Sequence, residues 1–238
     1  MPTPAAYGPD PRQVGEWWVP PGTGPWPLVV LVHGGYWRPG YDLTLEHEVA
    51  AALRSQGFLV WNVDYAPAGS PWPQTLLDVA AAYDHGVADP RVDRERVAVV
   101  GHSAGGHLAL WLASRRPGTP GGTPVVPPAL CVPQAPVACL ALGWQQRLGD
   151  GAVELFVGGA PDEVPDRYAD ADPLSLLPTA VPTVLLHGVA DDVVPVTQSE
   201  TYARASGCRL RRLPGGHFDH LDPTSEAVAA LLEELAHR

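Results

Sequence analysis

The sequence predicts an α/β fold, with a mainly parallel sheet that is covered by helices on both faces. The first observation is a series of short apolar runs that are continuous rather than alternating, which is typical of strands buried on both sides. The second is that segments with helical periodicity separate these runs, an alternation that implies right-handed crossovers. The expected strands are 28–32, 58–63, 97–100, 130–133, 137–142, 183–186 and 210–213.

Three segments between or after these strands repeat apolar residues every three or four positions, as amphipathic helices do. They cover 45–53, 76–87 and 228–235, and a further helix is expected to start directly after Ser103. Asp42 is expected to cap the first helix and Gly57 to end it. Asp222 followed by Pro223 is expected to cap the last helix.

The chain has 238 residues, a length typical of one large α/β domain. Hydrophobic residues make up 45% and charged residues 17%, so the chain has enough apolar side chains for a sizeable core. We therefore expect a single domain over 1–238. Within it, 1–25 is expected to be an irregular N-terminal segment and 160–178 a minimal cap.

The composition excludes several classes of function. All 15 basic residues are Arg, so the chain has no lysine for a Schiff base, a phosphate-binding loop or a Ser-Lys dyad. The formal net charge of -11 opposes binding to nucleic acid, because that affinity comes largely from basic side chains that neutralise phosphates. We therefore expect neither lysine chemistry nor a nucleic-acid partner.

The cysteines and the apolar segments indicate a cytoplasmic protein. The three cysteines are an odd number in a chain with ample core, which disfavours a disulfide framework. Residues 1–18 are interrupted by prolines where an export signal needs a continuous apolar stretch. No segment approaches the roughly 18 apolar residues of a membrane span, so no membrane association is expected.

Residues 101–105, Gly-His-Ser-Ala-Gly, carry the strongest chemical signal. They join a buried strand to a helix through a turn with Ser103 at its tip. A serine in such a strained turn exposes its hydroxyl, and glycines two positions before and after it let the turn close. An ordinary helix cap is the alternative, while a dinucleotide fingerprint would need glycine in place of Ser103. We interpret Ser103 as a nucleophile.

The two other groups that a serine nucleophile needs follow in the chain order acid, then histidine. Asp191 lies in the loop after strand 183–186, with Asp192 as its competitor. His217 lies in a loop before the last helix and is the expected general base. His220 is a weaker candidate, expected to be exposed.

An oxyanion hole is expected beside Ser103. The strand 28–32 ends in His-Gly-Gly-Tyr-Trp, and the glycines allow the backbone to approach an acyl oxygen. The backbone N–H groups of Gly35, Tyr36 and Ala104 are the expected donors. His33 and His187 are interpreted as structural. No helical histidine pair with metal-ligand spacing is present, so a metal is not expected.

Four segments together suggest a known family. They are His33-Gly34-Gly35-Tyr36-Trp37, Gly101-His102-Ser103-Ala104-Gly105-Gly106-His107-Leu108-Ala109, His187-Gly188-Val189-Ala190-Asp191 and Gly216-His217-Phe218. The set resembles the α/β-hydrolase superfamily of serine esterases. The H-G-G-x-W form of the first segment is similar to the kynurenine formamidase (arylformamidase) and related carboxylesterase branch.

The resemblance implies an α/β-hydrolase fold and a cofactor-independent serine hydrolase that acts on a small-molecule ester or amide, either a carboxylic ester or an aryl formamide. Trp37 and His102 are the expected substrate-binding residues, and Arg38 is considered as a partner for a substrate carboxylate. A homodimer is compatible with the sequence. The alternative function is a non-catalytic binding protein on the same scaffold, because fold does not fix function.

Overall fold

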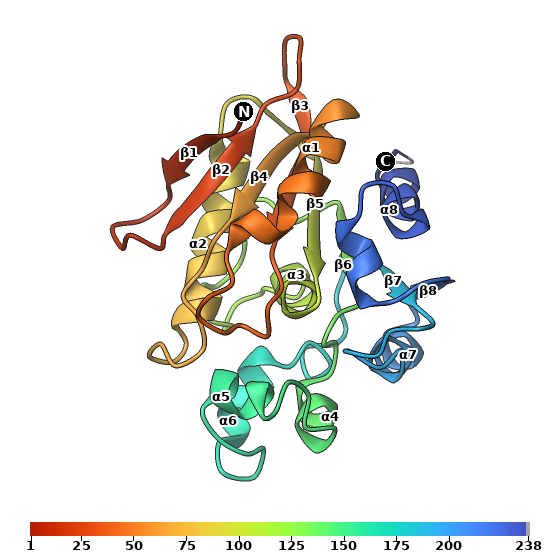
Figure 1. Ribbon diagram of the computed structural model, residues 1–238. Coiled ribbons are helices and arrows are strands. Elements are labelled where there is room, and N and C mark those ends of the chain that lie inside the picture. The colour runs from red at the N-terminus through yellow and green to blue at the C-terminus, as the bar shows by residue number, and fades with distance from the viewer. Residues whose placement is uncertain (237–238) are drawn as a thin grey trace.

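The computed structural model describes residues 1–236, which form one eight-stranded sheet in the order β1-β2-β4-β3-β5-β6-β7-β8 (Figure 1). Every pairing among β4, β3, β5, β6, β7 and β8 is parallel, while β1–β2 and β2–β4 are antiparallel. The predicted mainly parallel sheet is confirmed. The strands are β1 Thr3–Ala6, β2 Val14–Trp18, β3 Trp26–Val32, β4 Leu59–Val63, β5 Val92–His102, β6 Leu130–Gln134, β7 Val184–Gly188 and β8 Arg209–Leu213.

The expectation that 1–25 is irregular was wrong, because this segment supplies β1 and β2. The two strands form the antiparallel end of the sheet, at the left of Figure 1. Trp17 of β2 is buried and stacks on Trp61 of β4 with 4.5 Å between ring centroids. The apolar area buried by this aromatic pair ties the N-terminal segment to the sheet.

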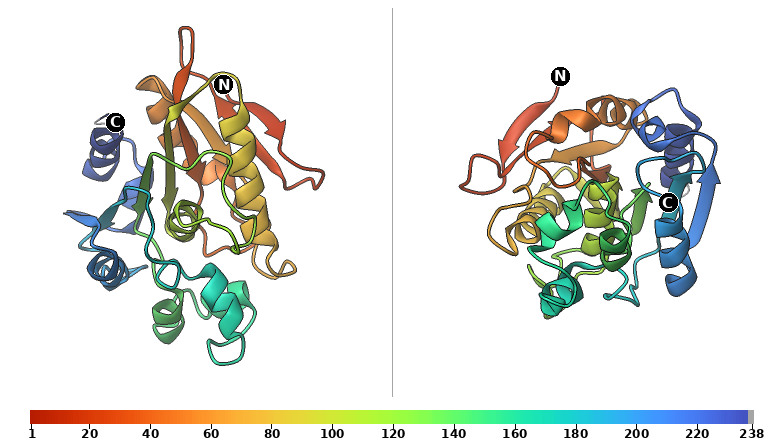
Figure 2. Two further views of the ribbon diagram at one scale, coloured as in Figure 1. Left: turned by 180° about the vertical axis from the view of Figure 1, so that it is seen from behind. Right: turned by 60° about the horizontal axis from the view of Figure 1, so that its bottom comes forward.

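Helices cover both faces of the sheet, as predicted. The apolar sides of α1 and α8 join one core cluster, and those of α2, α3 and α7 join the other. Figure 1 shows α1 in front of the sheet, and the view from behind in Figure 2 shows α2 there. These helices are α1 His47–Ser55, α2 Gln74–Ala88, α3 Ala104–Ala113, α7 Thr197–Ser206 and α8 Glu226–Ala236.

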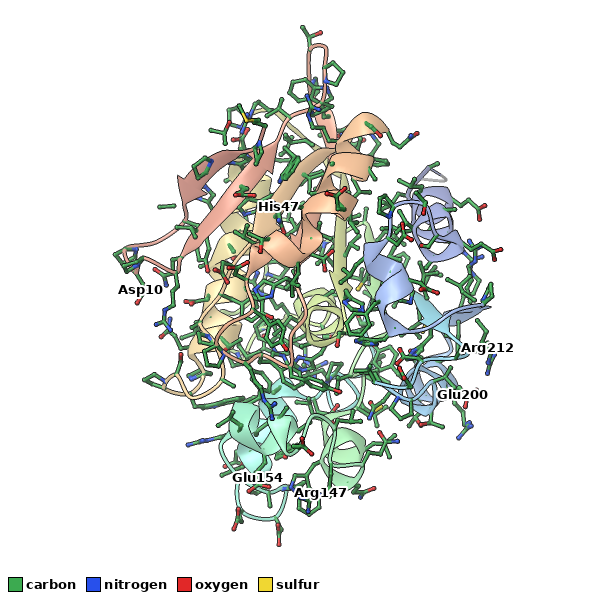
Figure 3. The ribbon with its side chains drawn as sticks, in the orientation of Figure 1. Asp10, His47, Arg147, Glu154, Glu200 and Arg212 are labelled. Atoms are coloured by element: carbon green, nitrogen blue, oxygen red, sulfur yellow. The ribbon has the colours of Figure 1, made fainter. Side chains whose placement is uncertain are left out.

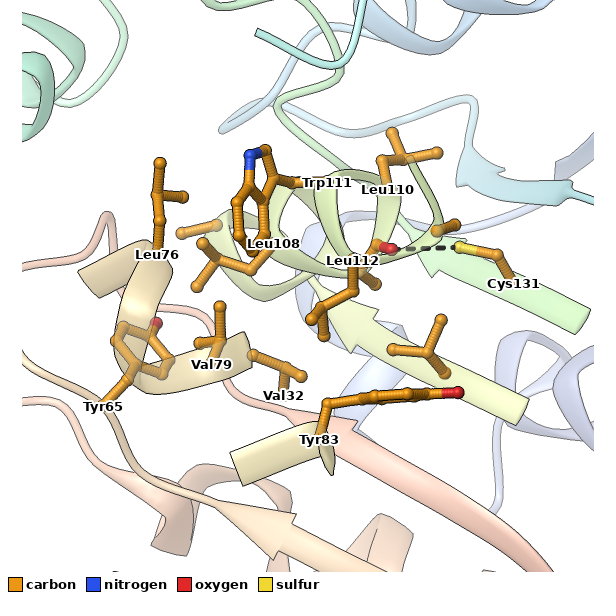
Figure 4. Packing of buried hydrophobic residues seen from close by; sticks show 14 of the residues in the cluster. Val32, Tyr65, Leu76, Val79, Tyr83, Leu108, Leu110, Trp111, Leu112 and Cys131 are labelled. Atoms are coloured by element: carbon orange, nitrogen blue, oxygen red, sulfur yellow. Dashed lines mark hydrogen bonds between the residues drawn. The ribbon is translucent and has the colours of Figure 1, made fainter. Parts of the chain in front are cut away.

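The centre of the larger cluster is α3, which is buried along its whole length. Leu108, Trp111 and Leu112 of this helix pack toward Val79 and Tyr83 of α2 (Figure 4). Because α3 begins directly after Ser103, burial of the helix fixes the position of that residue. Some charged pairs lie at the surface, for example Arg212 of β8 beside Glu200 of α7, 2.8 Å apart (Figure 3).

Two further local predictions were wrong. Residues 137–142 were expected to form a strand, but α4 (Leu140–Gln145) starts inside them. A short apolar run fits a buried helix as well as a buried strand, and here the helix forms. The last helix is capped by Ser225, whose Oγ accepts a hydrogen bond from Val228 N–H, rather than by Asp222. Asp42 does cap the segment after it, as predicted, by accepting from Thr44 N–H.

Three short helices lie together at one end of the molecule, at the bottom of Figure 1: α4, α5 (Ala152–Val157) and α6 (Pro165–Ala171). The carboxylate of Asp172 joins this group to the chain after α6, because it accepts from the N–H groups of Ala141 and Leu174. None of the helices within residues 1–236 is long and apolar enough to cross a membrane.

Glu46 is a buried acid directly before α1. It ends the 3₁₀ helix η1 (Leu43–Glu46), and neither of its carboxyl oxygens has a hydrogen-bond partner in the described part of the chain. Burial raises the pKa of this carboxyl from 4.5 to about 8, because the charged form would lose its hydration. Folded protein therefore keeps a proton on Glu46 between about pH 4.5 and 8, where the unfolded chain releases it.

We predict that Glu46→Gln removes the part of the pH dependence of the free energy of unfolding that comes from this carboxyl. In the wild type, the raised pKa contributes to the free energy of unfolding. This stabilising contribution is fully present below pH 4.5 and is lost as the pH rises toward 8. The free energy of unfolding of the variant, relative to wild type, should therefore increase by about 1.4 kcal/mol per pH unit across this window. Urea unfolding at several pH values measures it. The exposed Glu48→Gln on α1 is the control, and parallel curves for wild type and Glu46→Gln would contradict the assignment.

Candidate active site

The turn at Ser103 joins the end of β5 to the start of α3 and has the predicted strained geometry. Ser103 has φ 58° and ψ -118°, a conformation that non-glycine residues rarely adopt. The glycines on either side are required by close backbone contacts. A Cβ on Gly101 would lie 2.2 Å from the Gly105 carbonyl oxygen, and a Cβ on Gly105 would lie 2.0 Å from that of Val32. No residue other than glycine fits either position without displacing the backbone.

The loop after β3 lies directly against this turn. A Cβ on Gly34 would be 3.1 Å from the Cβ of Ser103. Gly35 and Tyr36 both have positive φ values, 105° and 53°, so the loop turns sharply at this point. The N–H groups of Tyr36 and Ala104 donate to no acceptor within residues 1–236, which leaves them free to bind an anionic oxygen. The loop thus lies where an oxyanion hole is expected.

Asp191, and not Asp192, lies against His217. The Nδ1–H of His217 donates to Oδ2 of Asp191 at 2.7 Å, and both side chains are almost fully buried. Oδ1 of Asp191 accepts from the N–H groups of Val193 and Val194 at 2.9 and 2.8 Å. Asp192 is exposed. The hydrogen bond assigns the proton of neutral His217 to Nδ1 and leaves Nε2 unprotonated, as a general base requires.

A second histidine also contacts this carboxylate. Nε2 of His187 lies 3.3 Å from Oδ2 of Asp191 and 2.9 Å from the carbonyl oxygen of Val194. Because a carbonyl only accepts, His187 carries its proton on Nε2, and its Nδ1 accepts from the Ser199 hydroxyl at 2.7 Å. Burial alone would raise the pKa of Asp191, but hydrogen bonds from His187 and His217 outweigh it and hold that pKa well below its usual range.

His102 and His220 lie beside the His217 ring. Nε2–H of His102 donates to the carbonyl oxygen of His217 at 2.9 Å. Burial is the main cause that lowers the pKa of His102, and it lowers that of His220 to about 3, so both rings are neutral at neutral pH. His220 was expected to be exposed, but it is fully buried beside Gln134 because the 3₁₀ helix η2 (His217–Leu221) turns it inward.

Ser103, His217 and His102 line one cavity of about 100 Å³, together with Gly35 and Tyr36 of the loop. The remaining lining residues were not anticipated from the sequence as site residues: Tyr41, Leu45, Val193, Phe218 and Leu221. Because Phe218 follows His217 in the chain, its place in the cavity lining could have been predicted from the sequence. Leu45 lies in η1 and Leu221 at the end of η2, while Tyr41 and Val193 lie outside the helices and strands, and no local pattern marks any of the four as a site residue.

Trp37 does not line this cavity, although it was expected to bind substrate. Its side chain is buried, stacks on Phe156 at 4.5 Å between ring centroids and meets His107 edge to face. The positive φ of Trp37, 55°, belongs to the sharp turn of this loop, and the indole packs into the core. The guanidinium of Arg38 donates to the carbonyl oxygen of Gly149. Arg38 therefore connects the loop to the segment before α5.

Within residues 1–236 no cluster of three or more His, Cys, Asp or Glu side chains has the arrangement of a metal site. The groups that lie together around the cavity are a hydroxyl, an imidazole paired with a carboxylate, and free backbone N–H groups. This is the set of groups that nucleophilic acyl transfer uses.

Solved structures identify the fold. A truncated carbohydrate esterase from gut microbiota superposes with a TM-score of 0.80 at 17% identity, covering 99% of this chain and 95% of the other. An acetyl ester-xyloside bifunctional hydrolase from Caldicellulosiruptor lactoaceticus gives 0.78 at 22% identity, with 99% and 95% covered. The fold is that of the α/β-hydrolases. At these identities the likeness shows the fold alone.

Sequence comparisons point to esterases. Residues 18–118 match the BD-FAE family. Esterase LipC of Mycobacterium tuberculosis is 30% identical over 260 aligned positions, which cover 96% of this chain and 64% of LipC. The probable carboxylic ester hydrolase LipM of the same organism is 28% identical, with 76% of this chain and 44% of LipM covered. The chain thus spans about two thirds or less of the length of these relatives.

Proposed function

We propose that this chain is a serine carboxylesterase that works through an acyl-enzyme. One observation supports this proposal above all others: His217 holds its Nδ1 proton against the buried carboxylate of Asp191 while its ring lines the same cavity as Ser103. A neutral imidazole in this tautomer accepts a proton at Nε2. The esterase relatives LipC and LipM support the same reaction class.

In the proposed reaction Ser103 Oγ attacks the ester carbonyl carbon while its proton passes to Nε2 of His217. The carbonyl oxygen becomes an oxyanion and accepts hydrogen bonds from the N–H groups of Tyr36 and Ala104, with Gly35 as the third expected donor. The bond from carbon to the alcohol oxygen then breaks, and His217 gives its proton to that oxygen. Water attacks the acyl-serine, losing a proton to His217, and the carboxylic acid leaves as Ser103 regains its proton.

Asp191 stabilises the imidazolium that forms twice in this cycle. Its carboxylate stays ionised because four groups donate to it or face it: His217, His187 and the N–H groups of Val193 and Val194. A buried carboxylate held this firmly keeps the His217 ring in one orientation. No proton needs to reach Asp191 itself.

A carboxylic ester suits this cavity better than an aryl formamide such as N-formylkynurenine. None of the residues that line the cavity is Asp, Glu or Arg, and Arg38 is bonded to the Gly149 carbonyl. The amino-acid part of a formylkynurenine would therefore meet no cationic partner for its carboxylate at the cavity. We propose a neutral ester with a small acyl group, in keeping with the volume of about 100 Å³.

We predict that Ser103→Ala lowers kcat for p-nitrophenyl acetate by about 10⁴-fold or more, because the nucleophile is gone. Steady-state hydrolysis measured by nitrophenolate release checks this. The variant keeps the backbone of the turn and the packing of α3, so its thermal unfolding should match that of the wild type. A variant that keeps most of its activity would refute Ser103 as the nucleophile.

Substrate choice gives a separate prediction. We expect wild-type kcat/KM for p-nitrophenyl acetate to exceed that for N-formylkynurenine by about 100-fold or more, because the cavity lacks a group that pairs with the carboxylate. Initial rates on both compounds, with Ser103→Ala as the blank, measure the ratio. Equal or greater turnover of the formamide would replace the ester proposal with the formamidase one.

A further inference from the structure

The rim of the active-site cavity carries apolar side chains that are exposed to solvent. Phe218 is 65% exposed and Tyr41 is 50% exposed, and both line the cavity that contains Ser103. Leu45 is a third exposed apolar residue in the same lining. Isolated exposed apolar residues need no explanation, but three around one cavity form a patch that is suited to bind an apolar group.

Phe218 is tied to the general base by position and by contact. It follows His217 in η2, and the two rings meet edge to face with centroids 5.2 Å apart and planes at 86°. Another part of the lining is formed by Tyr41, whose side chain occupies the space beside Gly35: a Cβ on that glycine would lie 2.4 Å from the Tyr41 ring. Phe218 thus lies beside His217, and Tyr41 lies beside Gly35 in the loop after β3.

The chemistry of ester cleavage determines which part of the substrate Phe218 meets, an argument that rests on the proposed function. Nδ1 of His217 is occupied by Asp191, so Nε2 protonates the departing alcohol oxygen and must lie within hydrogen-bond reach of it. The carbonyl oxygen faces the N–H groups of Tyr36 and Ala104 instead. The alcohol part of the ester therefore extends along the side of the cavity where His217 and Phe218 lie.

We infer that Phe218 is a specificity-determining residue that binds the alcohol part of the substrate, and that the preferred alcohol carries a flat aromatic ring, as in an aryl ester. An aromatic ring gains from stacking or edge-to-face contact with Phe218. A sugar alcohol would need polar partners for its hydroxyls, and the lining offers few: it has no Asp, Glu, Arg, Asn or Gln side chain, and the Tyr36 hydroxyl already donates to the Val193 carbonyl.

The experiment compares two acetate esters that form the same acetyl-enzyme, phenyl acetate and trifluoroethyl acetate, an activated ester without a ring. In Phe218→Ala, the preference for phenyl over trifluoroethyl acetate, expressed as the ratio of kcat/KM values, should fall about tenfold relative to wild type. Phe218→Trp should retain the preference. The matched control is Leu77→Ala on α2, an equally apolar residue that is 38% exposed and lies outside the cavity lining.

The rates of formation and hydrolysis of the acetyl-enzyme, measured separately, distinguish a contact with the alcohol from a general structural effect, which would slow both steps. The alcohol has left before water attacks, so the loss in Phe218→Ala should fall on acylation, measured by rapid mixing, and not on hydrolysis of the acetyl-enzyme. An unchanged ester preference, or equal losses in both steps, would overturn the role of Phe218. If the role of Phe218 is overturned in this way but Ser103→Ala is inactive, the esterase proposal still holds. An active Ser103→Ala would contradict both the esterase proposal and the role of Phe218.

Discussion

The geometry of the site depends on one constraint: the backbone must turn from β5 into α3 within the space of a single residue. Ser103 accepts a strained conformation there because its neighbours are fixed by burial, with β5 in the sheet centre and α3 enclosed by the core. The close approach of Gly105 to Val32 at the end of β3 also brings the loop after β3, with Gly35 and Tyr36, to Ser103. Core packing therefore stabilises a turn that would be unfavourable on its own.

Asp191 and His217 depend on a second buried arrangement. Asp191 is enclosed by donors, two of them backbone N–H groups that cannot move away and two of them histidines. His187 is in turn held by Ser199 of α7, so a helix on one face of the sheet contributes to the orientation of the His217 ring. Supporting contacts of this kind reduce the motion of a reacting group and preserve its geometry.

The sequence predicted what local patterns determine. Ser103, Asp191 and His217 each follow a recognisable strand, and their chain order pointed to an acid after strand 183–186 and to His217. It left Asp192 as the alternative acid, which the hydrogen bond between His217 and Asp191 decides. The sequence analysis was wrong where contacts between distant segments determine the local structure. β1 and β2 lie in a proline-containing segment; β1 pairs with β2, and β2 pairs with β4, where Trp17 stacks on Trp61. Trp37 turns into the core, and Tyr41 reaches the cavity because its side chain packs against Gly35, while Leu45 reaches it from η1.

The central claim is that Ser103 is made nucleophilic by His217 and Asp191. The most direct measurement is labelling with a fluorophosphonate, followed by mass spectrometry of the digested protein. One adduct is predicted per chain, on the peptide that contains Ser103, and Asp191→Asn should slow its formation about 10³-fold or more, because the imidazole loses its correct tautomer. An adduct on another residue, no adduct at all, or equal labelling rates in wild type and Asp191→Asn would contradict the claim.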